Sequence, residues 1–298
     1  MKLITTDWVR KHLPPRNEDA HKGTFGRVLV VAGSHRMCGA GYLCALSALR
    51  AGAGLVAWAL PDRLQPSFAA ALPEVITVPL PCTKEGVISA QAQTKLKHFC
   101  TQFTPSVIAV GPGMGKSPLL RFILEKVPVP LVVDADALNF IAAHRTVRLP
   151  DNRPCIFTPH PGEMARLLGS AVAQTDSLRQ SQAEEWACKT GNVVVLKGNG
   201  SLVAGKGKLI KNTTGGPALA KGGNGDVLTG IIAGLWGQLG TASHFDFDTS
   251  WQAAVCGVYI HGLAGDLMTR DKTSYGVLAS EVANRVPIAI KQILETRR

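Results

Sequence analysis

Apolar residues along the chain form short runs that end in glycine or polar residues, with helical periodicity in between. The first strong run lies in residues 27–34 and is continuously apolar from residue 28 to residue 32, as in a strand buried on both faces of a parallel sheet. A small-residue helix is predicted over 42–51, followed by a strand over 55–60. This strand–loop–helix–strand order is typical of a right-handed crossover between parallel strands.

The same order repeats along the rest of the chain, without a linker-like change of composition and without an internal repeat. We therefore predict one α/β domain spanning residues 1–298, with a mostly parallel central sheet and helices on both faces. The further strands are predicted at 106–110, 130–133, 155–157 and 192–196, the further helices at 5–13, 117–126, 176–190, 250–269 and 277–295, and a hairpin over 201–211.

Residues 212–230 combine a loop rich in glycine and hydroxyl groups with a buried helix that is predicted to begin near Val227. Such a junction presents free backbone N–H groups and the positive end of the helix dipole, which together suit an anion. Asp226 stands at this junction. It is either a helix N-cap or an acid, base or orienting group, and the stretch taken alone favours the cap.

Polar or glycine-rich loops follow five of the predicted strands, and in a parallel sheet such loops collect at one edge. Each loop alone is explained by a turn, a cap or a packed histidine. Together they would place Asp134, His160, Lys197 and Asp226 around one crevice, which makes a purely structural explanation less attractive. The loops are 33–34, 111–115, 134–139, 158–163 and 197–201.

Composition narrows the class of protein. A hydrophobic content of 46% and a charged content of 18% indicate a globular protein rather than a disordered one. No apolar run reaches membrane-spanning length, and the N-terminus lacks the apolar core of a signal peptide. Seven scattered cysteines, with no metal-ligand spacing, suggest reduced thiols in a cytoplasmic protein.

The net charge of +11 suits anionic substrates such as nucleotides. The basic residues are dispersed and form no aromatic-interleaved stripe, so we expect neither a nucleic-acid nor a membrane partner. The sequence contains no zinc-ligand spacing, no P-loop and no Gly-x-Gly-x-x-Gly after the first strand. A helix N-terminus with one Asp beside it fits phosphoryl transfer to a hydroxyl group.

Residues 222–230, Gly-Gly-Asn-Gly-Asp-Val-Leu-Thr-Gly, resemble the signature of the ADP/ATP-dependent NAD(P)H-hydrate dehydratases, a branch of the ribokinase-like superfamily. The resemblance covers nearly the whole chain, and the five loops look like that family's blocks in its order. Residues 158–163 are the most specific block, because sugar and vitamin kinases of the superfamily usually carry Asn in place of His160. The resemblance implies a ribokinase-like fold.

The resemblance also implies an activity. The protein would be a nucleotide-repair lyase that dehydrates the S epimer of hydrated NADH or NADPH, using ADP and releasing AMP and phosphate; eukaryotic relatives use ATP. A kinase-like route is expected, with phosphorylation of the hydrate hydroxyl and then loss of phosphate. The alternative is a small-molecule kinase of the same superfamily, acting on a vitamin precursor or a sugar. A nucleotide-binding regulatory protein is a more distant alternative.

Mg²⁺ as a cofactor and a homotetrameric assembly are further implications of the resemblance. Many relatives carry an N-terminal epimerase domain. Because the segment before the first predicted strand is short, we expect no such domain in this chain and a separate epimerase acting on the same substrate.

The resemblance assigns the site residues in two groups. Asp226 would orient or deprotonate the substrate hydroxyl, and Glu163 would help to position Mg²⁺ through water. The residues implied to contact the hydrate are Ala40, Gly113, His160 and Asp226, and those implied to hold the nucleotide are Lys197, Gly198, Asn199, Gly200, Ser201 and Gly225.

Four positions depart from the family's pattern. Thr is expected at Lys221, Asn224 and Ser201, and Asn is expected at Gly216. The Asn and Ser replacements keep hydrogen-bonding capacity, whereas Lys221 adds a charge beside the predicted phosphate site.

Overall fold

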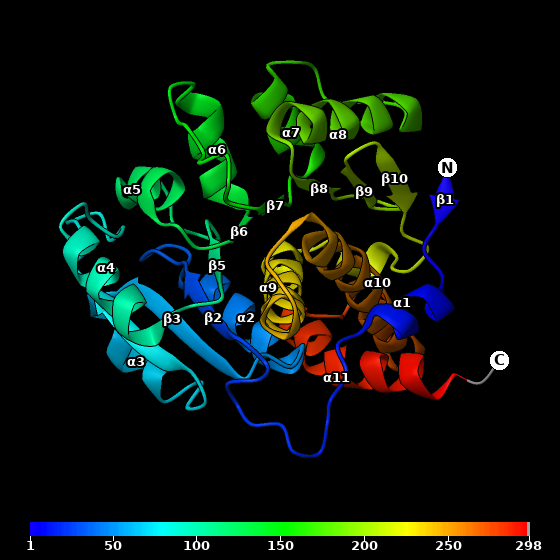
Figure 1. Cartoon of the computed structure of the whole chain (residues 1–298), viewed down its shortest axis with the longest axis horizontal. Helices are drawn as coiled ribbons and strands as arrows, with labels where there is room; N and C mark the ends of the chain where they lie inside the picture. The colour runs from blue at the N-terminus through cyan, green and yellow to red at the C-terminus, as the bar shows by residue number, and fades with distance from the viewer. Residues whose placement is uncertain (297–298) are drawn as a thin grey trace.

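The apolar runs of the sequence become the strands of one ten-stranded sheet in the computed structural model, which describes residues 1–296 (Figure 1). The strands are β1 (Lys2–Leu3), β2 (Arg27–Val31), β3 (Leu55–Pro61), β4 (Ile76–Leu80), β5 (Val107–Val110), β6 (Leu131–Val133), β7 (Cys155–Phe157), β8 (Val193–Leu196), β9 (Leu202–Gly205) and β10 (Lys208–Lys211). Their order is β1-β10-β9-β8-β7-β6-β5-β2-β3-β4. Among the strands of residues 1–296, only β9 runs antiparallel to its neighbours, so the mostly parallel sheet is confirmed.

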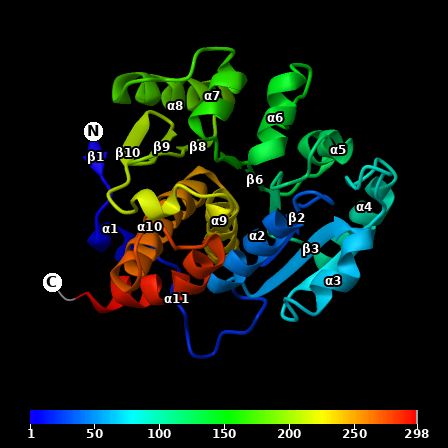
Figure 2. The same ribbon diagram turned by 180° about the vertical axis from the view of Figure 1, so that it is seen from behind.

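Helices cover both faces of this sheet, as predicted. One face carries α1 (Thr6–His12), α2 (Cys38–Arg50), α3 (Gln65–Ala69), α9 (Asn224–Ala242), α10 (Phe247–Asp271) and α11 (Ala279–Glu295). The other carries α4 (Ala92–Phe103), α5 (Leu119–Lys126), α6 (Ala135–Ala143), α7 (Pro161–Leu168) and α8 (Asp176–Thr190). Figure 2 shows the two groups from behind, with the sheet between them. The short 3₁₀ turns are η1 (Asp62–Leu64) and η2 (Pro217–Leu219).

Successive side chains of the strands contribute alternately to two hydrophobic cores, one on each face of the sheet. In β2, Val28 and Val30 pack under α2 and α9, while Leu29 and Val31 pack on the opposite side of the sheet. Successive side chains of a strand point to opposite faces, so a strand that is apolar at every position is buried on both.

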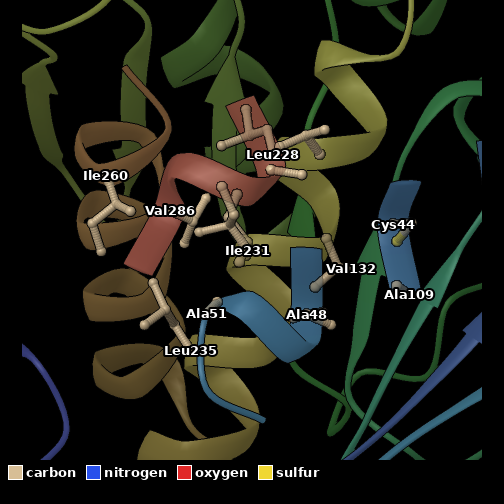
Figure 3. Close-up of a cluster of buried hydrophobic side chains, with 14 of the residues drawn as sticks. Cys44, Ala48, Ala51, Ala109, Val132, Leu228, Ile231, Leu235, Ile260 and Val286 are labelled. Carbon is tan, nitrogen blue, oxygen red and sulfur yellow. The ribbon is translucent and has the colours of Figure 1, made fainter. Parts of the chain in front are cut away.

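Helix α9 is the central element of one layer. Its glycine face lies against α2 so closely that a Cβ at Gly234 would stand 2.6 Å from the carbonyl oxygen of Ala48. Its apolar face, with Leu228, Ile231 and Leu235, packs among the helices shown in Figure 3. Because both faces of α9 are fixed by packing, the first turn of the helix is held rigidly at the edge of the sheet.

Several predicted boundaries were wrong. The sequence pattern predicted no element between residues 62 and 105, where the structure has α3, β4 and α4. Residues 134–139 were predicted as a loop, but α6 begins at Ala135, because its Ala- and Leu-rich sequence favours a helix. The helix predicted from Val227 begins three residues earlier, at Asn224. Among residues 1–296, no helix combines the length and the apolar character needed to cross a membrane.

Candidate active site

The loops that follow β2, β5, β6, β7 and β8 lie at one edge of the sheet, because these five strands are parallel neighbours. Backbone hydrogen bonds join the loops to one another. The N–H of Lys197 donates to the carbonyl of Pro159 at 2.8 Å, and the N–H of Gly33 donates to the carbonyl of Pro112 at 2.8 Å. The predicted convergence of polar loops is therefore present, and the loops are fixed relative to one another.

A buried ion pair forms the centre of this edge. Lys197 Nζ lies 2.7 Å from Asp134 Oδ1 and 3.9 Å from Glu163 Oε2. Asp134 is only 1% exposed, and its second oxygen accepts a hydrogen bond from Thr229 Oγ1 of α9 at 2.7 Å. Burial lowers the pKa of Lys197, but the carboxylates of Asp134 and Glu163 outweigh that effect and raise it above its ordinary value. The lysine therefore stays charged.

The first turn of α9 lies directly over this lysine. A Cβ added to Gly225 would stand 3.3 Å from Lys197 Nζ, so glycine at this position lets the helix backbone approach the cation. The unpaired N–H groups of the helix N-terminus and the lysine charge therefore act on the same space. That combination suits the phosphate groups of a nucleotide.

Asp226 belongs to the first turn of α9 and does not cap it. The cap position is Gly223, with a φ of 93°, and no side chain caps the helix there. The interpretation of Asp226 as an N-cap is therefore wrong. Burial raises the pKa of its carboxyl to about 7, with the nearby charge of Asp134 acting in the same direction and Lys197 opposing it. A carboxyl with such a pKa exchanges a proton readily at neutral pH.

Besides Asp226 in α9, the residues expected to contact the hydrate are Ala40 in the first turn of α2, Gly113 after β5 and His160 after β7. Gly113 has a φ of 61°, and a Cβ added to it would stand 2.9 Å from the Cβ of Ala40 and 2.7 Å from the carbonyl oxygen of Met37. Ala40 and Gly113 are thus direct neighbours, and little space remains between them. His160 follows β7 and has an exposed side chain.

His160 and Glu163 cap α7 reciprocally. The ring nitrogen Nδ1 of His160 accepts a hydrogen bond from the N–H of Gly162 at 3.0 Å, and Glu163 Oε2 accepts from the N–H of His160 at 2.7 Å. Burial and then the charge of Lys197 lower the pKa of His160, so its ring is neutral at physiological pH. The Pro-His-Pro-Gly-Glu sequence thus fixes both the helix start and the direction of the imidazole.

A cavity of about 360 Å³ opens beside the ion pair. Residues 197–201 and Gly225 form one wall, which brings together all six residues expected to hold a nucleotide. The opposite wall consists of residues from the 212–220 loop and from α10, including Pro217, Leu219 and Val258. The cavity is therefore cationic at one end and has apolar side chains along its walls, as a nucleoside phosphate requires.

Hydrogen bonds hold the opposite wall against α10. The side-chain amide of Asn212 donates to the carbonyl of Val258 at 3.0 Å, and Thr214 Oγ1 donates to the carbonyl of Tyr259 at 2.8 Å. Asp266 Oδ2 accepts from the N–H of Gly215 at 2.8 Å. The glycine loop is thus preorganised before any ligand binds.

Two of the lining residues that were not predicted as site residues carry polar atoms without a partner in the described part of the chain. His261, 8% exposed, and Asn224, 3% exposed, line the cavity, and within residues 1–296 neither His261 Nε2 nor Asn224 Oδ1 has a hydrogen-bond partner. Burial and the charge of Lys197 lower the pKa of His261 to about 4, so the ring is neutral. Leaving a buried polar atom unpaired costs about 1–3 kcal/mol, which a polar ligand would recover. Asn224 was noted only as a departure, and His261 lies within an apolar helix without a local signal.

Comparisons with known proteins agree on one family. A family profile described as NAD(P)H-hydrate dehydratase matches residues 28–287. A bifunctional NAD(P)H-hydrate repair enzyme from Moorella thermoacetica is 40% identical over 99% of this chain and 54% of its own length. The ADP-dependent (S)-NAD(P)H-hydrate dehydratase of Bacillus subtilis is 35% identical over 95% of each chain. The chain thus spans about half the length of the bifunctional relatives it matches.

Solved structures show the same relationship. The ADP/ATP-dependent NAD(P)H-hydrate dehydratase from Bacillus subtilis, co-crystallized with ATP/Mg²⁺, superposes with a TM-score of 0.82 at 32% identity over 98% of each chain. A ribokinase-like superfamily protein from Enterococcus faecalis gives a TM-score of 0.82 at 26% identity over 99% of this chain and 97% of its own. The predicted ribokinase-like α/β fold is confirmed.

Proposed function

The chain belongs to the NAD(P)H-hydrate dehydratase family, and on this premise we propose that it dehydrates the S epimer of hydrated NADH or NADPH with ADP as phosphate donor. The products are the intact dinucleotide, AMP and phosphate. One observation carries the proposal: Asp226, with its pKa raised to about 7, follows Gly225, which lines the cavity and lies over Lys197. A proton acceptor, a fixed cation and a helix N-terminus are thus adjacent.

In the proposed reaction, the hydroxyl of the hydrate attacks the terminal phosphoryl group of ADP while Asp226 accepts the hydroxyl proton, and AMP leaves as the bridging phosphorus–oxygen bond breaks. The carbon–oxygen bond then breaks, phosphate leaves with the electron pair, and loss of a ring proton forms the double bond. Lys197 and the N–H groups of the first turn of α9 offset the negative charge that develops during phosphoryl transfer.

We assign binding of the hydrate to the side of the site formed by Ala40, Gly113 and His160. Ala40 and Gly113 are in direct contact at this edge of the sheet, where a Cβ added to Gly113 would stand 2.9 Å from the Cβ of Ala40. A neutral His160 offers a hydrogen-bonding group without adding charge beside Lys197. Residues 197–201 and Gly225 are assigned to the nucleotide, which the adjoining cavity supports.

Mg²⁺ fits this site only if the phosphates of the nucleotide provide some of its ligands. Within residues 1–296, no three His, Cys, Asp or Glu side chains are grouped as metal ligands. Glu163 already accepts a hydrogen bond from His160 and is nearly buried, so we assign it a contact with Mg²⁺ through water. Mg²⁺ commonly keeps several waters and binds through substrate phosphates, whose charge it neutralises.

The proposal is tested by incubating the protein with hydrated NADH and ADP and following the absorbance of restored NADH. We expect recovery of NADH with release of one AMP per NADH. The absence of recovery with either ADP or ATP would exclude the dehydratase activity. Phosphorylation of a vitamin precursor or a sugar instead would identify a kinase of the same superfamily.

We also propose a single dehydratase domain over residues 1–298, a homotetrameric assembly and a cytoplasmic location. We further propose that a separate epimerase interconverts the hydrate epimers. Sedimentation of the purified protein tests the assembly, and a monomer at micromolar concentration would contradict it.

A further inference from the structure

Arg179 of α8 contacts the 197–201 loop and is not among the residues that line the cavity. Its side chain is only 12% exposed. Its Nη1 donates to the carbonyl of Asn199 at 3.0 Å, and its Nη2 donates to the carbonyl of Gly200 at 3.4 Å. Asp176 Oδ1 accepts from the same Nη1 at 3.1 Å, so the guanidinium group is held in place.

These contacts determine the direction of the loop's N–H groups. Each peptide unit is planar and trans, so a carbonyl and the N–H of the following residue point in opposite directions. Because Arg179 holds the carbonyls of Asn199 and Gly200 on the α8 side, the N–H groups of Gly200 and Ser201 point away from α8, where both residues line the cavity. Within the described part of the chain, neither N–H group makes a backbone hydrogen bond of normal geometry, although residues 199–200 form a turn that brings the N–H of Ser201 toward the carbonyl of Gly198.

The loop conformation depends on this approach of the arginine. Gly198 has a φ of 149°, and a Cβ added to it would stand 2.8 Å from Arg179 Nη2. Gly200 has a φ of 60°, in the left-handed region that favours glycine. On the same side, Lys211 Nζ donates to Asp176 Oδ2 at 2.8 Å. Successive N–H groups in such a turn form a concave site for an anion.

We propose that Arg179 is a positioning residue for the phosphate donor, acting by turning the N–H groups of Gly200 and Ser201 toward its phosphates. The residue contacts the loop and does not line the cavity. The inference rests on the proposed function, because it takes ADP as the ligand of this cavity. It adds a residue outside the family's motifs to the site.

The test compares Arg179→Ala with Lys189→Ala, which removes the same charge from the same helix at an exposed position. By isothermal calorimetry, we expect Arg179→Ala to raise the Kd for ADP about tenfold or more, since it removes two hydrogen bonds from a charged donor. Lys189→Ala should bind ADP as the wild type does. The kcat for hydrate repair at saturating ADP should change less than about twofold, because Arg179 acts on binding. Millimolar ethylguanidinium should restore part of the lost affinity.

The outcomes are distinguishable. A wild-type protein that binds no ADP would refute the proposed function itself. A folded Arg179→Ala variant with wild-type affinity, or an equal loss in Lys189→Ala, would overturn the positioning role alone. If Arg179→Ala does not fold, the test uses the NMR resonances of the backbone amides of Gly200 and Ser201 in the wild-type protein, with and without ADP. We expect ADP to shift both downfield, and unshifted resonances would overturn the inference.

Discussion

Asp226 gives the sharpest prediction, because its raised pKa links activity to stability. The pKa of its carboxyl is raised from 3.8 to about 7, mainly by burial. The folded state therefore holds this proton more tightly than the unfolded state does. The stabilising contribution is present at low pH and is lost as the pH rises from about 4 to about 7. Asp226→Asn removes the ionisation and should avoid this loss.

The expected change in unfolding free energy follows from the size of the pKa shift of Asp226. About three pKa units at 1.36 kcal/mol each set an upper value of about 4 kcal/mol for the gain in unfolding free energy at pH 8. Lys197 stabilises the ionised form and the site relaxes on charging, so we expect a gain of about 1–2 kcal/mol at pH 8 and much less at pH 5. Turnover should fall by about 10²–10⁴-fold, the usual contribution of a general base. ADP binding should be largely retained.

Urea unfolding at pH 5 and pH 8, together with the NADH-recovery assay, measures both effects. Asp151→Asn, an exposed carboxylate in a remote loop, is the control and should change neither. A stability difference that does not depend on pH would refute the conclusion that partial burial disfavours the charged form of Asp226. Unchanged turnover would refute its proposed role in the reaction. In the wild type, kcat/KM should rise between pH 6 and pH 8 as the base loses its proton.

Three further substitutions test other parts of the site. Lys197→Met leaves Asp134 buried without its cation, so we expect a loss of about 3 kcal/mol in urea unfolding and much weaker ADP binding; wild-type affinity would contradict the proposed phosphate contact. Gly113→Ala adds a Cβ against Ala40 at a position with a left-handed backbone, so KM for the hydrate should rise while the Kd for ADP stays constant. A raised Kd for ADP with an unchanged KM for the hydrate would show that Gly113 belongs to the nucleotide side of the site instead. His261→Phe should raise the Kd for ADP about tenfold and leave binding of inorganic tripolyphosphate unchanged, as calorimetry would show. Equal losses of affinity for ADP and tripolyphosphate would show that His261 contacts the phosphate groups of the nucleotide.

Strands that are buried on both faces were predictable, because their burial requires an apolar residue at nearly every position. The central strands β2, β5 and β8 are continuously apolar because both faces are covered, and their order places the polar loops at one edge. The edge strand β4 was missed, because Pro79 interrupts a short and partly exposed segment. Helix α4 is mostly polar, so its periodicity gave little signal.

In the candidate site, too, some residues are indicated by their local sequence and others are not. Lys197 and Asp226 stand beside glycines in recognisable motifs, so their local sequence indicated a functional role. His261 and Arg179 reach the cavity and its loop only because α10 and α8 pack beside them, and no local pattern reports such packing. Asp226 was ambiguous for a related reason. Whether it caps α9 depends on where the helix begins, and glycine-rich junctions leave that boundary uncertain by several residues.

Three carboxyl groups lie around Lys197, and their partners decide which of them exchanges a proton. Asp134 is paired with Lys197 at 2.7 Å and accepts a hydrogen bond from Thr229, so both of its carboxylate oxygens already have partners. Glu163 is fixed by the N–H of His160 at 2.7 Å in the cap of α7. Within residues 1–296, the side chain of Asp226 accepts no hydrogen bond, and the charge of Asp134 adds to its burial. Replacing Asp134 with Asn should therefore lower the pKa of Asp226 and shift the rise of kcat/KM to lower pH, whereas an unshifted profile would assign that rise to another group.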